Sequence, residues 1–195
     1  MRKKMVILGL IISMVVLIGL YLLEPIFLMK NDQEMRWYKT YGGIGIDASM
    51  FLIQTTDGGF ALAGLTNSSG AGGMDMWLVK TDGNGVAQWN KTYGGVGRDI
   101  AWVLLQTVDG GFAVAGSTNS SGTGEHIMWL AKMDVNGVVQ WNKTYEGIGE
   151  FGVAAFQTEN GDYVLACNNR SEDMFLSLFT TFLVKTDTNG VPQWN

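Results

Sequence analysis

The sequence is short of cysteine, histidine and basic residues, and each shortage excludes a class of protein. Cys167 is the only cysteine, so no disulfide can form within the chain and stability must come from packing. His126 is the only histidine, and a lone histidine rarely finds the convergent partners that a metal or catalytic site needs. Beyond residue 30 there remain nine of the 13 Lys and Arg against 17 of the 18 Asp and Glu, which leaves about eight net negative charges. Nucleic acid is therefore not expected as a partner, because phosphate binding needs a basic face.

The first 30 residues differ from the rest and form a segment of their own. Residues 5–23 are 19 consecutive uncharged, mostly large apolar residues, preceded by Arg2, Lys3 and Lys4. As a helix this run reaches about 28 Å, close to the ~30 Å of a bilayer core. We predict an uncleaved signal anchor over residues 1–30 that makes the chain a single-pass protein of the cell membrane, with the part after residue 30 extracytoplasmic. The alternative is a cleaved signal and a secreted protein, but the apolar run is long for a signal peptide and no A-x-A cleavage pattern follows it.

Residues 31–195 contain a repeat of about 52 residues. Four tryptophans mark the repeat at spacings of 52, 52 and 53: Trp37, Trp89, Trp141 and Trp194. The sequence DGGFALAG at 57–64 also returns as DGGFAVAG at 109–116. A period of this length indicates a solenoid, a propeller or an array. The repeats lie at about 37–88, 89–140 and 141–195.

Each repeat contains four short apolar segments separated by turn residues. In the first repeat these segments are residues 48–55, 60–66, 76–81 and 86–93. They are rich in aromatic and β-branched residues, which favours strands, and the D-G-G and D-x-N-G sequences between them supply the positive φ angles of tight hairpins. Four antiparallel strands about every 50 residues are typical of a propeller blade. The predicted fold is all-β, a partial β-propeller of about three four-stranded antiparallel blades, preceded by an N-terminal transmembrane helix.

The third copy stops at Asn195, inside what should be its fourth strand. Three blades do not close a ring, since propellers use about four to eight. An open arc leaves the apolar faces of its end blades in water. We therefore expect a fragment of a longer protein or, as the alternative, one part of a ring that other chains complete, with self-association through the open blade edges.

The repeated pattern D-G-G-F-x-x-A-G-x-T, a Gly and Ser loop, and W-L-V-K-x-D-x-x-G-x-x-x-W-x-K-T-Y-G-G resembles a known family. It is similar to the propeller-forming repeats of secreted archaeal and bacterial surface proteins, with blades of kelch length, and the match covers residues 37–195. The D-x-N-G-x-x-x-W element also looks like the tryptophan-docking motif of quinoprotein propellers and, less closely, the Asp-box hairpin of sialidases. The resemblance implies a fold, and fold alone does not fix function.

An antiparallel meander places the loop after the second strand and the link between blades at one end, and the tight hairpins at the other. The longer and more variable loops lie at the first end, where we expect any binding site. Five polar residues there are the candidate ligand contacts: Asp47, Asp75, Arg98, Asp99 and Glu150. Because Asp47 and Asp99 occupy matching positions in their repeats, the alternative is that they hold the linkers in place by hydrogen bonds.

Two recurring patterns have both a structural and a functional interpretation. Trp77, Trp129 and Phe182 recur in register and fit either a carbohydrate platform or packing between blades, which we favour because a ligand site seldom repeats in every unit. The aspartates of the D-x-N-G turns resemble part of a calcium loop but lack the other oxygen ligands, so we expect them to form the turns. No metal site and no cofactor are expected.

Five N-x-S/T sequons lie in the part expected outside the cell: Asn67, Asn90, Asn119, Asn142 and Asn169. Asn90 and Asn142 fall within predicted strands, and chance is a rival explanation in a segment rich in Asn, Ser and Thr. Asn67 and Asn119 are the preferred glycosylation candidates.

Two functions of different classes follow from these features. The first is a non-enzymatic surface module, anchored in the membrane, that presents loops to proteins or glycans. The second is part of a propeller enzyme, either a sialidase-like hydrolase or a quinoprotein-like oxidoreductase. A sialidase needs an arginine cluster, but the exported part has only Arg36, Arg98 and Arg170 at non-matching repeat positions. We therefore predict a protein that is not an enzyme and has no catalytic residues.

Overall fold

A computed structural model of the chain describes residues 38–122, 124–146, 151–170 and 179–193. The chain divides into two compact units, Met1–Tyr38 and Lys39–Asn195, and every described strand belongs to the second. The described residues form an all-β fold of three antiparallel sheets, without helices.

The first sheet contains β1 (Asp47–Gln54), β2 (Phe60–Thr66), β3 (Asp75–Thr81) and β4 (Ala87–Tyr93). The second contains β5 (Asp99–Gln106), β6 (Phe112–Thr118), β7 (Ile127–Met133) and β8 (Val139–Tyr145). The third contains β9 (Phe151–Gln157), β10 (Tyr163–Arg170) and β11 (Phe179–Thr186).

Each sheet is a meander in which consecutive strands pair, and the first two sheets confirm the four antiparallel strands predicted for a repeat. The third sheet has three strands, ordered β11-β10-β9. A fourth begins beside β11, where Pro192 forms a bridge with Thr186 and the Gln193 amide donates to the Lys185 carbonyl at 2.7 Å.

The predicted transmembrane helix at residues 5–23 lies outside the described residues. Within the described part of the chain, no helix is long and apolar enough to cross a membrane.

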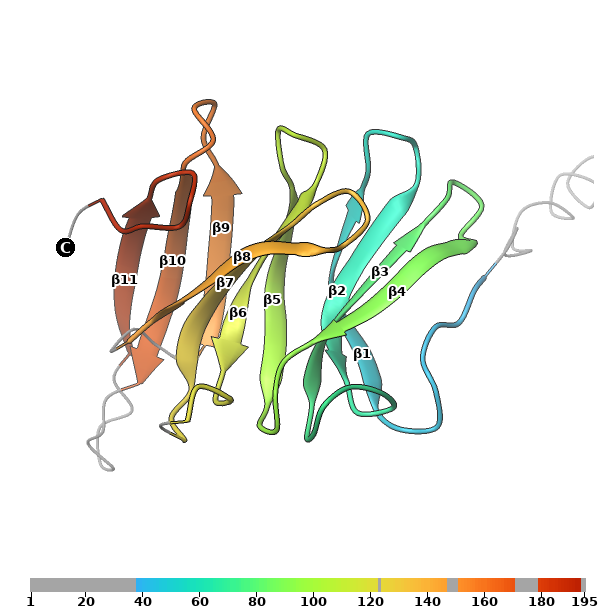
Figure 1. The fold of residues 1–195 in the computed structure, drawn as a ribbon, viewed down its shortest axis with the longest axis horizontal. Coiled ribbons are helices and arrows are strands. Elements are labelled where there is room, and N and C mark those ends of the chain that lie inside the picture. The colour runs from blue at the N-terminus through green and yellow to red at the C-terminus, as the bar shows by residue number, and fades with distance from the viewer. Residues whose placement is uncertain (1–37, 123, 147–150, 171–178, 194–195) are drawn as a thin grey trace, which may run out of the picture. The chain divides into compact units, whose positions relative to one another are not determined.

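The sheets pack face to face along the chain. The first strands of the sheets are consecutive neighbours, because β5 contacts β1 on one side and β9 on the other. Figure 1 shows the second sheet between the other two.

Two core clusters fill the spaces between the sheets. One, which includes Leu78 and Leu104, joins the first and second sheets, and the other, which includes Leu130 and Leu165, joins the second and third. Aromatic pairs span both interfaces at 5.6 Å between ring centroids, with planes at 78°: Trp89 with Phe112 and Trp141 with Tyr163. The repeating apolar positions are therefore the contacts between successive sheets.

Two hydrogen bonds also recur between successive sheets. The last tyrosine of a sheet donates its hydroxyl to a glycine carbonyl in the D-x-N-G turn of the next: Tyr93 to Gly137 at 2.7 Å and Tyr145 to Gly190 at 2.8 Å. The last glutamine of a first strand accepts a turn amide of the preceding sheet: Gln106 from Thr56 at 2.8 Å and Gln157 from Val108 at 3.0 Å. Burial raises the pKa of Tyr93 and Tyr145, so both hydroxyls stay protonated donors at neutral pH.

The described residues leave the outer faces of the end sheets uncovered. Leu52 on β1 is 59% exposed, whereas Leu104 at the same place in the second repeat is fully buried. Leu183 on β11 is 56% exposed, and its counterpart Leu130 is fully buried. Each exposed leucine belongs to a face that the neighbouring sheet covers elsewhere in the chain.

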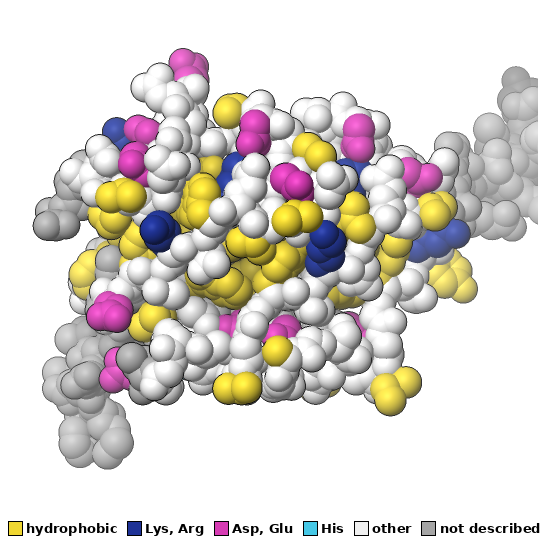
Figure 2. All heavy atoms as spheres, viewed as in Figure 1, with side chains coloured by type: hydrophobic (Ala, Val, Ile, Leu, Met, Phe, Trp, Pro, Cys, Tyr) yellow, Lys and Arg dark blue, Asp and Glu magenta, His cyan; other side chains and the backbone are white. Residues whose placement is uncertain are grey.

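The turns lie at two ends of the sheets, as the meander predicts. The tight hairpins after the first and third strands are at one end, called the hairpin end, and the links and second-strand loops are at the other, called the loop end (Figure 1). Figure 2, drawn in the same view, shows a band of apolar side chains across the middle of the molecule's visible face, with acidic side chains toward the hairpin end and the loop end.

The D-x-N-G turns form as predicted. Asp82 Oδ1 accepts the amides of Asn84 at 2.8 Å and Val86 at 2.9 Å, and Gly85 has a φ of +72°. Asp134 and Asp187 accept the equivalent amides at 2.8 to 2.9 Å. These hydrogen bonds confirm that the aspartates build the turns.

Candidate functional site

At the loop end, the link between the first two sheets is organised by the carboxylate of Asp99. This side chain is fully buried at the start of β5. Its Oδ1 accepts the Thr118 hydroxyl, and its Oδ2 accepts Ser120 Oγ at 2.8 Å and the Gly95 amide at 3.0 Å. By accepting these three hydrogen bonds, the carboxylate ties the link before β5 to the end of β6 and the loop after it.

Asp47 makes the same set of contacts in the first repeat. Its Oδ1 accepts the Thr66 hydroxyl, and its Oδ2 accepts Ser68 Oγ at 2.7 Å and the Gly43 amide at 2.8 Å. These hydrogen bonds, that of Ser68 first, lower the pKa of Asp47. Both aspartates thus make the contacts expected of residues that hold the linkers, and their ligand role stays a prediction.

The two preferred glycosylation candidates accept hydrogen bonds from the backbone of the links that precede β1 and β5. The Oδ1 atoms of Asn67 and Asn119 accept the amides of Ile46 and Arg98, each at 2.5 Å. Asn67 is exposed and Asn119 is half-buried. Glycosylation at either residue stays a prediction.

Arg98, Asn67 and Asn119 come together around one cavity of about 500 Å³, here called the linker cavity. Its backbone frame is a parallel bridge between Met74 and Arg98, continued by a 2.6 Å hydrogen bond from the Asp99 amide to the Met74 carbonyl. Arg98 is exposed at the rim.

The structure brings Asp75 close to Asp99, whereas Asp47 lies in the preceding repeat. Asp75 is buried and accepts the Ala71 amide at 3.0 Å, and a side chain at Gly94 would collide with both Asp75 and Asp99. Asp47 holds the equivalent position one repeat earlier, and Glu150 lies outside the described residues. The four candidates that the structure describes therefore do not form one cluster.

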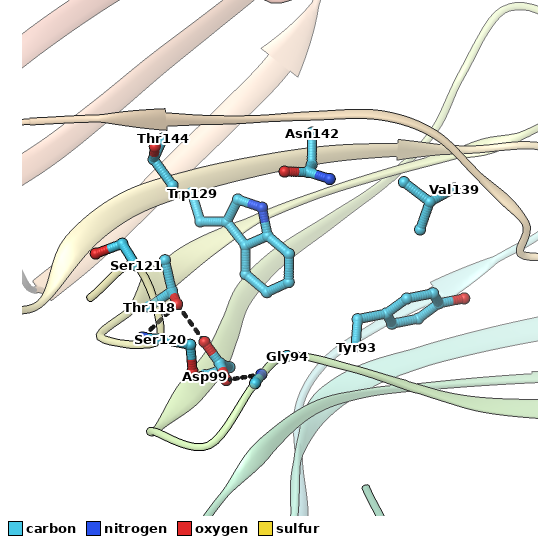
Figure 3. A pocket seen from close by; sticks show the side chains of 11 residues that line it. Tyr93, Gly94, Asp99, Thr118, Ser120, Ser121, Trp129, Val139, Asn142 and Thr144 are labelled. Carbon is cyan, nitrogen blue, oxygen red and sulfur yellow. Dashed lines mark hydrogen bonds between the residues drawn. The ribbon is translucent and has the colours of Figure 1, made fainter. Parts of the chain in front are cut away.

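A second cavity at the loop end, of about 430 Å³, is here called the Trp129 cavity (Figure 3). It lies among the link to the second sheet, the loop after β6, and strands β7 and β8. Figure 3 shows the Trp129 indole between the Asp99 network on one side and Asn142 on the other. Its lining consists of Tyr93, Gly94, Gly95, Asp99, Thr118, Ser120, Ser121, Trp129, Val139, Asn142 and Thr144. Sequence analysis assigned Trp129 to packing, and the structure confirms that it belongs to the core between sheets while one side lines this cavity.

At the hairpin end, sequence analysis missed a buried lysine in each of the first two sheets. The Lys132 side chain is 7% exposed, and its Nζ donates to Asp109 Oδ2 at 2.8 Å, Gln140 Oε1 at 2.8 Å and the Met133 carbonyl at 3.0 Å. Lys80 makes the equivalent bonds to Asp57, Gln88 and Thr81. A signal was present, because the Asp of D-G-G and the Lys of W-L-V-K recur together in both repeats.

These ion pairs lower the pKa of the paired carboxyls. Partial burial raises the pKa of Asp109, but hydrogen bonds from Lys132, Thr107 and the Gly111 amide outweigh it and bring the value to about 2. The hydrogen bond from Lys80 does most to hold the pKa of Asp57 well below its usual range. A cavity of about 480 Å³ lies beside Asp57 and Lys80, but the bonds of Lys80 are already directed at protein acceptors. This arrangement is that of a structural ion pair.

In the described part of the chain, no group of three or more His, Cys, Asp or Glu is placed to hold a metal ion. Cys167 is buried, which raises the pKa of its thiol to about 11 and disfavours the reactive thiolate.

Comparison with known proteins adds no family. No protein-family model matches the chain, and a search of curated proteins found no significant match.

Proposed function

We propose that the chain is a membrane-anchored, extracytoplasmic partial β-propeller that acts as a non-enzymatic binding module for proteins or glycans. The observation that carries the binding role is the Trp129 cavity, whose lining brings together an indole, an amide and several hydroxyl groups. The apolar segment at residues 5–23 supports the anchor, and the basic residues before it support the orientation.

The propeller proposal is supported by how the sheets meet. Successive sheets pack through their first strands, and the same aromatic and tyrosine contacts recur at both interfaces. Repetition of one interface between successive sheets is the arrangement of propeller blades.

The Trp129 cavity supports binding rather than catalysis. Its carboxylate, Asp99, is fully buried and already accepts three hydrogen bonds, so it is poorly placed to accept a proton from a substrate. The exposed Asn142 and Thr144 present an amide and a hydroxyl at the rim. Groups of this kind beside an aromatic ring suit a sugar, which offers hydroxyls and apolar C–H faces.

Binding can be tested with a glycan array and titration calorimetry on chain produced without glycosylation. Asn142→Ala and Thr144→Val should each weaken binding about tenfold, since one net hydrogen bond is worth about 1 kcal/mol. Lys143→Ala is the matched control, because Lys143 lies between them on β8 and its side chain points to the other side of the strand. If neither rim variant differs from the control, or if the chain releases product from sialosides or reduces an acceptor with added quinone, the proposal fails.

The anchor is tested separately by fractionation and protease treatment of intact cells. The full chain should stay with the membrane, and protease added outside should remove the part after residue 30. Protection from outside protease would contradict the extracytoplasmic location.

A further inference from the structure

Residues 39–43, with the sequence K-T-Y-G-G, repeat the end of β4 and the residues after it. At residues 91–93, K-T-Y forms the end of β4 and pairs with β3. In the described structure residues 39–43 are not part of a strand. We call them the orphan segment.

The orphan segment nevertheless makes the contact of a fourth strand with the next sheet. Tyr41 donates its hydroxyl to the Gly85 carbonyl at 2.7 Å, as Tyr93 does to Gly137 and Tyr145 does to Gly190. In those two cases the tyrosine belongs to the sheet that precedes the turn. The orphan segment therefore holds the place of the fourth strand of a sheet that would precede the first, and no such sheet occurs among the described residues.

The third sheet has the complementary gap. β3 and β7 each pair with a fourth strand, β4 or β8, and are buried along their whole length, whereas Thr180, Thr181 and Leu183 on β11 are exposed. Among the residues that the structure describes, Pro192 and Gln193 cover the end of β11 near Thr186 and Lys185. No other described strand pairs with the rest of this edge, whose backbone donors and acceptors make it a template for an added strand.

The exposed outer faces of the first and third sheets are also complementary to each other. The face of the second sheet that carries Leu104 packs on the first sheet, so Leu52 marks the face on which a preceding sheet would pack. The face that carries Leu130 packs on the third sheet, so Leu183 marks the face on which a following sheet would pack. Figure 1 shows these two sheets at opposite ends of the row, so one chain cannot bring the two faces together without rearranging.

We propose that a second copy of this chain covers these surfaces, head to tail, and that its orphan segment pairs with the exposed edge of β11. The pairings Leu78 with Lys91 and Leu130 with Lys143 fix the register. Transferred to the third sheet, they place Leu183 opposite Lys39 of the second copy and Thr181 opposite Tyr41 of the second copy.

Two copies suffice to close such an assembly. The contact is heterologous, because the first sheet of one copy meets the third sheet of the other, and such contacts form rings when the rotation closes. Two chains of three sheets give a ring of six, within the range of about four to eight that propellers use. This assembly does not depend on what the Trp129 cavity binds.

Disulfide cross-linking of the full chain in mild detergent tests the register. Two single variants, Lys39→Cys and Leu183→Cys, carry different tags and are co-expressed and then oxidised. Both positions are exposed, and opposed residues of antiparallel strands lie within disulfide reach. The native Cys167 is buried and should not compete.

The mixed pair should give a disulfide-linked dimer that carries both tags, and neither variant should do so alone. Lys39→Cys with Thr180→Cys is the control, because Thr180 is also exposed but lies three residues out of register. Cross-linking of either variant with itself would indicate a head-to-head contact and overturn the proposal, as would equal cross-linking of the control pair.

The mass of the detergent-solubilised full chain provides a second test. After subtraction of the detergent, light scattering should give twice the mass of one chain. Leu52→Asp and Leu183→Asp should shift it to one chain, whereas Val108→Asp, at a position 74% exposed in a hairpin turn, should not. A wild-type mass of one chain would overturn the proposal. That result is expected if further repeats of a longer chain cover the open sheets.

Discussion

Loss of the ion pair at the hairpin end should destabilise the protein most where the lysine is most buried, and the burial of the lysine differs between repeats. Asp109→Asn removes the charge that faces Lys132 but keeps an oxygen for the turn bonds from Thr107 and Gly111. In the third repeat, Lys185 is paired with Asp162 instead, at 3.3 Å and with a lysine side chain that is 34% exposed. Asp162→Asn is therefore the matched variant with the weaker pair.

The magnitude follows from the geometry of the two pairs. A hydrogen bond to a charged group contributes about 1.5 to 3 kcal/mol. Because the Asp109 side chain is 53% exposed, solvent screens the pair, and we expect Asp109→Asn to cost about 1 to 2 kcal/mol at pH 7. The pair in the third repeat should cost less, about 0 to 1 kcal/mol, because its distance is 3.3 Å against 2.8 Å and its lysine side chain is 34% exposed against 7% for Lys132.

The pH dependence has a defined sign. The folded pKa of Asp109 is about 2, below the ~3.9 of an unfolded aspartate, so the ionised form favours folding. Its contribution should be fully present above about pH 4 and disappear as the pH falls toward 2. Asp109→Asn should lack this part of the acid destabilisation.

Guanidinium unfolding of the full chain in mild detergent, followed by tryptophan fluorescence, measures both effects. Wild type and both variants are compared at pH 7 and across the acid range. An unchanged midpoint for Asp109→Asn at pH 7, or a larger loss for Asp162→Asn, would refute the reasoning.

Three further substitutions test other contacts. Tyr93→Phe should lower the free energy of unfolding by about 1 to 2 kcal/mol, because the Gly137 carbonyl loses its donor between sheets; an unchanged value in the same unfolding assay would count against that contact. Gly116→Ala should cost about 2 to 3 kcal/mol or prevent folding, because the added methyl would collide with the Ile100 carbonyl at the bulge of β5, and circular dichroism would show this. Asp99→Ala should cost about 2 kcal/mol and speed exchange of the Gly95 amide, measurable by hydrogen exchange, and slow exchange in the variant would contradict the role given to the carboxylate.

The strands and turns could be predicted because their signals are local. The D-G-G and D-x-N-G sequences require special backbone angles, and β1 to β4 lie within a residue or so of the segments predicted for the first repeat. The repeat itself predicted that successive sheets would cover one another, and Leu104 and Leu130 do lie at such interfaces.

The candidate site was harder to predict because its hydrogen bonds join segments far apart in sequence. Asp99 was recognised by its repeated position, but its partners Thr118 and Ser120 lie about 20 residues further along, and a repeated position cannot distinguish a ligand contact from a structural bond. The partnership of Asp109 with Lys132 depends equally on which strands become neighbours. The third repeat shows the difficulty clearly, since Asp162 stands two residues from the position that matches Asp109 and yet reaches its lysine.

The most direct test of the account is an NMR measurement of contacts between the rings of successive repeats. Stacked sheets predict nuclear Overhauser effects between the Trp89 indole and the Phe112 ring, and between the Trp141 indole and the Tyr163 ring, since both pairs have centroids 5.6 Å apart. Absence of both, with the strands still formed, would show that the repeats fold into sheets that do not pack on one another, and would contradict the account.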